Sequence, residues 1–197
     1  ASTEPVGVSF DNSGRIYVAQ DTGVITIKDK TGQTLSTIGG SDREWKSILR
    51  TPSSVFYADE KIYVTDSGLD RIVVFSPDGD LIAAYGEKGG GPGEFYNPSD
   101  IYVYKGVLYV ADTGNDRIQV LGANGVFVDT IGVFEDPEKR LDDPLEVAVD
   151  DAGRIYVIDK TGTVKLYDRS GKYLKTIPGL TNVSSLCLAR EGILVAD

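Results

Sequence analysis

The sequence predicts an all-β protein, a β-propeller of four-stranded antiparallel blades, with four complete blades and the first two strands of a fifth. The segment Pro98–Gly132 shows the unit: four short runs rich in β-branched and aromatic residues, separated by turns that contain Gly, Asn or Asp. The tyrosines Tyr17, Tyr63, Tyr109 and Tyr156 lie 46, 46 and 47 residues apart. A four-stranded repeat of this length indicates a propeller with one blade per repeat.

In the clearest repeat we expect strands at Ile101–Tyr104, Val107–Asp112, Arg117–Leu121 and Val126–Gly132. The connections YKG and GANG are short enough for hairpins. Each blade needs a sheet on either side, because both of its faces are apolar. The blades are expected at about residues 5–51, 52–97, 98–143 and 144–182, with a partial blade at 183–197, and short helical turns only at 42–49 or 137–141.

The fifth blade has two strand runs, SSLCLA and GILVAD, and the sequence then ends at Asp197. A propeller removes its open sheet edges by closing into a ring. We therefore expect this single domain to be part of a ring with more blades than this sequence contains. Either another chain or a C-terminal segment missing from this sequence would complete it.

The repeats resemble those of NHL-repeat propellers. They share a Pro before the first strand, a run such as IYVAD followed by x-G-N-x-RI, a Gly-containing hairpin and a closing TIG. The match is best at Pro98, Tyr109–Asp112, Gly114–Ile118 and Gly125–Gly132, and Gly86–Pro98 resembles the glycine-rich segment before an NHL blade. The resemblance covers the whole chain and implies the fold, a propeller that forms part of a six-bladed ring. It leaves the activity open, because NHL propellers include enzymes, receptor sensor domains and interaction modules.

Composition excludes some functions. The net charge is −10, and an acidic surface repels phosphate backbones, so we expect no nucleic-acid partner. No apolar run is long enough for membrane insertion. Cys187 is the single cysteine, in an apolar strand, and we expect a buried, inert thiol. A chain that starts at Ala1 suits a secreted protein after signal removal, so we expect an extracellular or periplasmic location.

The loops indicate a binding face. The connections between strands one and two and between strands three and four are short, whereas three inter-blade links are long and unlike each other: Gly39–Thr51, Gly86–Asn97 and Gly132–Asp143. Variable loops on a rigid scaffold are where binding sites usually lie. Aromatic and Arg side chains are common interface anchors, although aromatics such as Phe95 serve equally well as caps of the core between blades. The candidate binding residues are Arg43, Trp45, Arg50, Phe95, Tyr96, Phe134 and Arg140.

Blades 2 and 3 carry an Asp-x-Gly-x-Asp-Arg element, at Asp66–Arg71 and Asp112–Arg117. Carboxylates at this spacing could ligate Ca²⁺, but the glutamate that closes an EF-hand loop is missing from both. We favour a structural interpretation. The first Asp hydrogen-bonds to turn amides, and the Arg pairs with an acidic neighbour between blades.

The first strand of each blade should line the central channel. Gly7, Ser54, Asp100, Glu146 and Ser185 occupy equivalent positions there. Two carboxylates that face each other across the channel mouth could hold a cation such as Ca²⁺, which makes Asp100 and Glu146 the candidate metal ligands. The alternative is that channel water hydrates them.

The absence of histidine limits catalysis. It removes the usual ligands of a zinc lyase and every Ser-His-Asp or Cys-His arrangement. We expect a non-catalytic module outside the cytoplasm that binds a protein, peptide or glycan without a cofactor. One alternative is a metal-dependent hydrolase or lyase, similar to lactonase propellers, that acts at the channel mouth through Asp100 and Glu146. Another is a structural subunit of an extracellular assembly.

Overall fold

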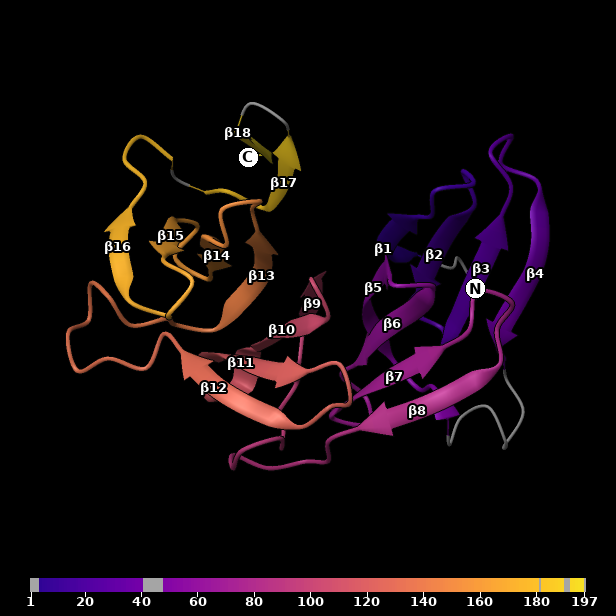
Figure 1. Ribbon diagram of the computed structural model, residues 1–197, viewed down its shortest axis with the longest axis horizontal. Coiled ribbons are helices and arrows are strands. Elements are labelled where there is room, and N and C mark those ends of the chain that lie inside the picture. Colours follow the sequence, from indigo (N-terminus) through magenta and orange to yellow (C-terminus); the bar gives the residue numbers. More distant parts are fainter. Residues whose placement is uncertain (1–3, 41–47, 181, 190–191, 197) are drawn as a thin grey trace.

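The computed structural model describes residues 4–40, 48–180, 182–189 and 192–196. They form four four-stranded antiparallel sheets and one two-stranded sheet. Figure 1 shows these sheets side by side in an arc, with the indigo first blade at one end and the yellow last strands at the other. The protein is a β-propeller of four complete blades and two strands of a fifth, as the repeat spacing predicts.

Each complete blade is a meander in which sequential strands pair. Blades 1 and 2 consist of β1 (Pro5–Phe10), β2 (Ile16–Gln20), β3 (Val24–Lys28), β4 (Thr34–Gly39), β5 (Pro52–Ala58), β6 (Lys61–Asp66), β7 (Arg71–Phe75) and β8 (Leu81–Tyr85). Blade 3, blade 4 and the last two strands consist of β9 (Asp100–Tyr104), β10 (Val107–Asp112), β11 (Arg117–Gly122), β12 (Phe127–Ile131), β13 (Pro144–Val149), β14 (Ile155–Asp159), β15 (Val164–Tyr167), β16 (Tyr173–Thr176), β17 (Ser185–Ala189) and β18 (Gly192–Ala196).

The meander places the loops on two opposite faces. The hairpin face carries the connections between strands one and two and between strands three and four. The link face carries the turns between strands two and three, together with the links from one blade to the next. This is the division that the loop lengths predict.

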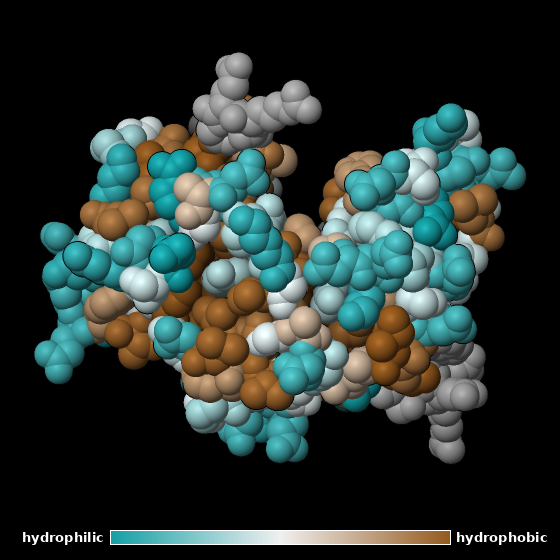
Figure 2. All heavy atoms as spheres, in the orientation of Figure 1, coloured by the Kyte–Doolittle hydropathy of each residue, from teal (hydrophilic) through white to brown (hydrophobic). Residues whose placement is uncertain are grey.

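The hydrophobic core lies between neighbouring blades. One cluster joins blades 1 and 2, another joins blades 2 and 3, a third joins blades 3 and 4, and a fourth joins blade 4 to β17 and β18. The second and third strands are buried on both faces for this reason, which explains their continuous apolar runs. Outer strands are more exposed, and Figure 2 shows apolar patches over β8 and β12, where Leu81, Ile82 and Val128 are at least half exposed.

Two local expectations are wrong. Cys187 is exposed, because one side of β17 is left uncovered by the described residues. A 3₁₀ helix, η1 (Thr113–Asn115), lies in a strand two–three turn, outside the two segments where helical turns were expected. Residues 137–141 hold only a hydrogen-bonded turn, in which the amide of Arg140 donates to the carbonyl of Asp136 at 3.0 Å. Of the other expected helical turn, residues 42–47 lie outside the described residues, and Ile48 is helical, as predicted.

Among the described residues, no helix combines the length and the apolar character needed to cross a membrane.

Candidate functional site

Buried aspartates at the ends of β6 and β10 hold the inter-blade links in place. The Asp66 carboxylate accepts hydrogen bonds from the backbone amides of Arg50 and Thr51, both at 2.8 Å, and from that of Gly68 at 3.1 Å. Asp112 accepts one from the amide of Tyr96 at 2.8 Å. Both carboxylates are fully buried and already bonded to amides, so the first Asp of each Asp-x-Gly-x-Asp-Arg element is a structural anchor, which is the interpretation that the sequence favoured.

The arginine of blade 3 bonds to an aspartate of its own blade and to the link that precedes the blade. Arg117 donates from Nε to Asp112 Oδ2 at 2.8 Å, and from Nη2 to the carbonyls of Gly91 and Glu94 in the preceding link. The expected pairing with an acidic residue between blades is therefore wrong for Arg117. Blade 4 reaches the same arrangement with a buried lysine that the sequence analysis missed: Lys165 pairs with Asp159 at 2.7 Å and donates to the carbonyl of Arg140.

A second pair of aspartates ties each turn to the next blade. Asp70 and Asp116 adopt left-handed backbone conformations, with φ of 51° and 54°. Their carboxylates accept hydrogen bonds from the amides of Asn97 and Asp143, at 2.7 and 2.8 Å. Asn97 and Asp143 directly precede the prolines that start blades 3 and 4, and they also have left-handed φ. These bonds fix the backbone of the last link residues above the turns.

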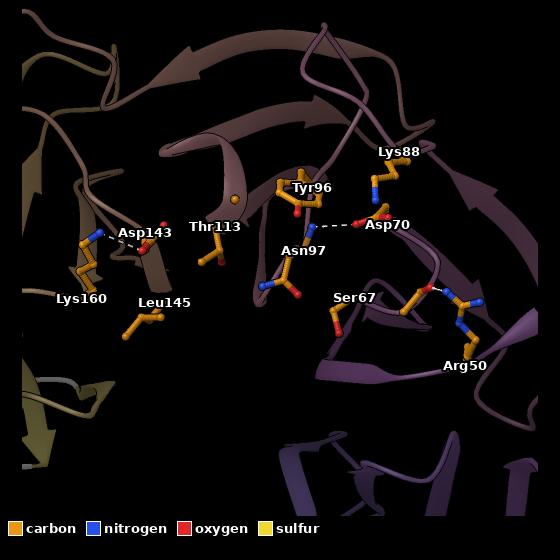
Figure 3. Close-up of a pocket in the computed structure, with 12 residues that line it drawn as sticks. Arg50, Ser67, Asp70, Lys88, Tyr96, Asn97, Thr113, Asp143, Leu145 and Lys160 are labelled. Carbon is orange, nitrogen blue, oxygen red and sulfur yellow. Dashed lines mark hydrogen bonds and ion pairs between the residues drawn. The ribbon is translucent and has the colours of Figure 1, made fainter.

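The turns and link ends surround an open hollow on the link face. Its volume is about 540 Å³, within the size range of small-molecule sites. Figure 3 shows its residues converging from blades 2, 3 and 4, with the Asn97 side chain between Leu145 and Ser67. The hollow is lined by Arg50, Ser67, Gly68, Asp70, Lys88, Tyr96, Asn97, Thr113, Gly114, Asp143, Leu145 and Lys160.

The floor of the hollow requires glycine at one position in particular. A Cβ atom on Gly114 would lie 2.4 Å from Cδ1 of Tyr96 and 2.7 Å from its carbonyl oxygen. The Gly114 amide donates to that carbonyl at 2.8 Å. The turn of blade 3 therefore packs directly against Tyr96 and holds its ring at the rim, where Tyr96 is 47% exposed.

The lining mixes both charges. Arg50, Lys88 and Lys160 are basic, whereas Asp70 and Asp143 are acidic, so the hollow is far less acidic than the chain as a whole, whose net charge is −10. Lys88 Nζ lies 4.9 Å from the centroid of the Tyr96 ring, a cation–π contact. Neither Arg50 nor Lys88 forms an ion pair with any described residue.

Three carboxylates meet at one end of the hollow. The oxygens of Asp116, Asp142 and Asp143 lie within 4.8 Å of one another, a grouping that could hold a metal ion. The ammonium of Lys160 already pairs with two of them, 2.7 Å from Asp142 and 2.9 Å from Asp143. Hydrogen bonds to these carboxylates raise the pKa of Lys160, so the lysine supplies the positive charge that this cluster needs.

Asp100 and Glu146 lie on the neighbouring first strands β9 and β13, so they do not face each other across the channel as expected. Asp100 accepts hydrogen bonds from the Ser54 hydroxyl at 2.6 Å and the Val147 amide at 3.0 Å, and Glu146 accepts one from the Leu186 amide at 2.8 Å. Each carboxylate therefore bridges to the next blade. Burial raises the pKa of Asp100 to about 6, and burial also raises the pKa of Glu146.

The structure separates the seven predicted binding residues. Arg50 and Tyr96 line the hollow. Phe95 does not reach the surface: it is fully buried between blades 2 and 3, which makes it a core residue. Phe134 is half-buried and stacks on Tyr167 with ring centroids 6.3 Å apart, and Arg140 is exposed outside the hollow. Arg43 and Trp45 lie outside the described residues.

Sequence reasoning missed most of the hollow, including Asp70, Lys88, Asn97, Asp143 and Lys160. One signal could have found two of them, because Asn97 and Asp143 immediately precede the proline that opens a blade. The residue before such a proline lies beside two strand two–three turns, one in the blade that it opens and one in the preceding blade.

Comparisons with known proteins agree with the fold. A family model described as "6-bladed beta-propeller" matches residues 46–133, which span blades 2 and 3, the two blades with the complete Asp-x-Gly-x-Asp-Arg element. No curated protein sequence matches the chain.

Three solved structures are similar along nearly all of the chain. A protein of unknown function from Bacteroides caccae has a TM-score of 0.69 and 14% identity, over 96% of this chain and 68% of its own. Streptogramin B lyase has a TM-score of 0.75 and 14% identity, over 97% of this chain and 61% of its own. Hydrazine synthase from Kuenenia stuttgartiensis has a TM-score of 0.75 and 17% identity, over 97% of this chain and 55% of its own. The chain thus spans between about half and two thirds of their lengths, and at these identities the likeness concerns the fold alone.

Proposed function

We propose that this chain is a non-catalytic binding module of the NHL-repeat type, which takes a partner in the hollow on its link face. The observation that carries the proposal is that the backbone around the hollow is hydrogen-bonded, whereas several polar side chains in it are not. The turn and link backbones are tied to Asp66, Asp70, Asp112 and Asp116, whereas the side chains of Tyr96, Asn97 and Lys88 have no hydrogen-bond partner among the described residues. Rigid backbone and available side-chain groups are the arrangement that a binding site needs.

The shape of the site supports the same function. Three blades contribute to a single concave surface, and the links between them vary in sequence while the blades keep one pattern. A partner that fills the hollow would contact all three blades at once. The resemblance of the repeats to NHL propellers is compatible with this role, since that family includes interaction modules.

A hydrolase or lyase at the channel mouth has weaker support. Asp100 and Glu146 each bond to a backbone amide of the next blade, so a metal ion would compete with bonds that join the blades. Calorimetry with Ca²⁺ on the chain and on Asp100→Asn tests this alternative. Heat that appears for the chain and is lost in the variant would support it. The expected location outside the cytoplasm stays a prediction, which fractionation of the producing cells tests.

Two lysines on opposite faces allow a direct test of the binding face. Lys88 lies over the ring of Tyr96 on the link face, 4.9 Å from its centroid, and Lys105 lies over the ring of Tyr104 on the hairpin face, at 4.7 Å. The chain is screened against an immobilised panel of defined peptides and oligosaccharides. Lys88→Glu should weaken whatever binding is found by at least about tenfold, whereas Lys105→Glu should leave it unchanged. Equal loss in both variants, or loss only in Lys105→Glu, would overturn the proposal.

A further inference from the structure

We infer that the ligand of the hollow is an uncharged oligosaccharide. This inference rests on the proposed function, because it names the class of ligand that the same site takes. It follows from which groups in the hollow are available for bonding, which are already used, and how charge is distributed around them.

The available groups include both donors and acceptors. The carboxamide of Asn97 has two N–H donors and one acceptor oxygen, and the phenol of Tyr96 can both donate and accept. Neither side chain bonds to any described residue, and Asp70 uses only its Oδ1 oxygen, on the Asn97 amide. A ligand that satisfies such a mixed set must itself donate and accept at closely spaced points. Neighbouring hydroxyl groups do this, since each hydroxyl has one donor and two lone pairs.

The backbone around the hollow is not available to a peptide. The amides of Tyr96, Asn97, Gly114 and Asp143 all donate within the protein, to Asp112, Asp70, the Tyr96 carbonyl and Asp116. Recognition of an extended peptide usually adds a strand through main-chain hydrogen bonds, and these turns offer no such edge. Side-chain groups must therefore carry the recognition, which suits a ligand without a repeating amide backbone.

Charge and apolar area narrow the class further. A polyanionic chain would meet the field of a protein with a net charge of −10, and a polycationic one would meet Arg50, Lys88 and Lys160 inside the hollow. The apolar lining is limited to partly exposed side chains, chiefly Tyr96 and Leu145, at 47% and 40%. An apolar ligand would find little to bury against. The C–H face of a sugar ring needs only one or two such contacts.

The experiment uses paired asparagines. Asn97 and Asn182 hold equivalent positions before β9 and β17, both with left-handed φ, of 52° and 60°, and only Asn97 lines the hollow. Glycine tolerates this backbone conformation, so Asn97→Gly and Asn182→Gly each remove a side chain without forcing the backbone to move. The probes are maltotriose, cellotriose, xylotriose and mannotriose, with trigalacturonic acid, chitosan trimer and a pentapeptide pool as comparisons. Binding is measured by calorimetry.

We expect at least one neutral trisaccharide to bind, with affinity at least about tenfold lower in Asn97→Gly and unchanged in Asn182→Gly. A panel in which no neutral sugar binds overturns the inference. If a charged sugar or a peptide binds instead and depends on Asn97, the ligand class is wrong while the proposed function stands. If a probe binds equally well to the chain and to Asn97→Gly, the placement of the site in the hollow is wrong as well.

Discussion

Blades 1 and 3 are both four-stranded meanders with the same strand order, but they differ in the blades that lie beside them. Val8 on β1 and Ile101 on β9 hold equivalent positions, and Val8 is 57% exposed whereas Ile101 is 1% exposed. The reason is that blade 2 covers Ile101, while the described residues place no sheet against that side of β1. The burial of a propeller position is therefore decided by the neighbouring blade and not by its own strand.

The two blades also differ at the end of the second strand. Blade 3 has Asp112 there, fully buried and bonded to the link before it, whereas blade 1 has Gln20 at the equivalent position. The amide of Glu4 in blade 1 instead donates to the exposed Asp21, at 3.2 Å. The hollow is built mainly from blades 2, 3 and 4, which all carry the buried aspartate, and it includes no residue of β1–β4, although Arg50 of the link after blade 1 lines it. The anchor and the hollow therefore occur together.

The largest expected difference between the blades comes from removal of this anchor. Asp112→Ala leaves the Arg117 guanidinium and the Tyr96 amide without their partner, and breaking a buried charge pair costs about 3–5 kcal/mol. Gln20→Ala should change the free energy of unfolding by less than about 1 kcal/mol. Urea unfolding of both variants measures the difference. Similar losses would mean that the anchor contributes no more than an ordinary surface residue.

Substitution of the exposed Val8 and of the buried Ile101 should change the free energy of unfolding by amounts that differ somewhat less. Ile101→Ala removes a side chain from the core between blades 2 and 3 and should cost about 2–4 kcal/mol. Val8→Ala should stay within about 0.5 kcal/mol, because Val8 already faces solvent. The midpoint of chemical unfolding compares them. A large cost for Val8→Ala would show that its side of β1 is covered in solution.

A smaller effect should appear as pH dependence. In blade 3 burial raises the pKa of Asp100 to about 6, whereas the equivalent residue in blade 1 is Gly7, which has no titrating group. Because the folded state binds this proton more tightly than the unfolded state, the contribution of Asp100 is most favourable below about pH 4 and declines as the pH rises to about 6. The decline is on the order of 2–3 kcal/mol, because the shift is about two pKa units. The free energy of unfolding of Asp100→Asn, measured between pH 4 and 7, should lack this decline. The same slope of unfolding free energy against pH in both proteins would contradict the assignment to Asp100.

Blade 1 should show a pH dependence of the opposite sign and the smallest size. Burial by itself raises the pKa of Asp11, but hydrogen bonds from Ser13, Arg15 and Tyr17 outweigh it and hold that pKa well below its usual range. Its contribution is therefore complete above about pH 4 and is lost as the pH falls further. We expect Asp11→Asn to cost about 1 kcal/mol at pH 7. Thermal unfolding at pH 7 and pH 3 checks this, because the gap should shrink at the lower pH.

The strands were predictable because their signal is local. In blade 3 the expected and observed bounds agree within one residue, since β-branched runs and Gly-containing turns set them. Most of the hollow was not predictable, because its residues lie in links, turns and strand ends without periodicity. The adjacent residues Phe95 and Tyr96 show this: one is fully buried and the other is 47% exposed. Their orientations depend on Asp112 and Gly114, which approach them only in the folded blade.

The aspartate anchors hold each link at the end that precedes the blade, and in the link before blade 3 Arg117 also holds Gly91 and Glu94. Asp112 holds Tyr96, and Asp66 holds Arg50 and Thr51, so within each link the anchor grips the last residues before the proline that opens the blade. A mostly exposed stretch such as residues 135–138, in the link before blade 4, can be lengthened or exchanged while the blade keeps its register, because surface insertions cost little loop-closure entropy. The propeller therefore resembles an antibody framework, on which foreign loops could be grafted to change what is recognised without redesign of the sheets.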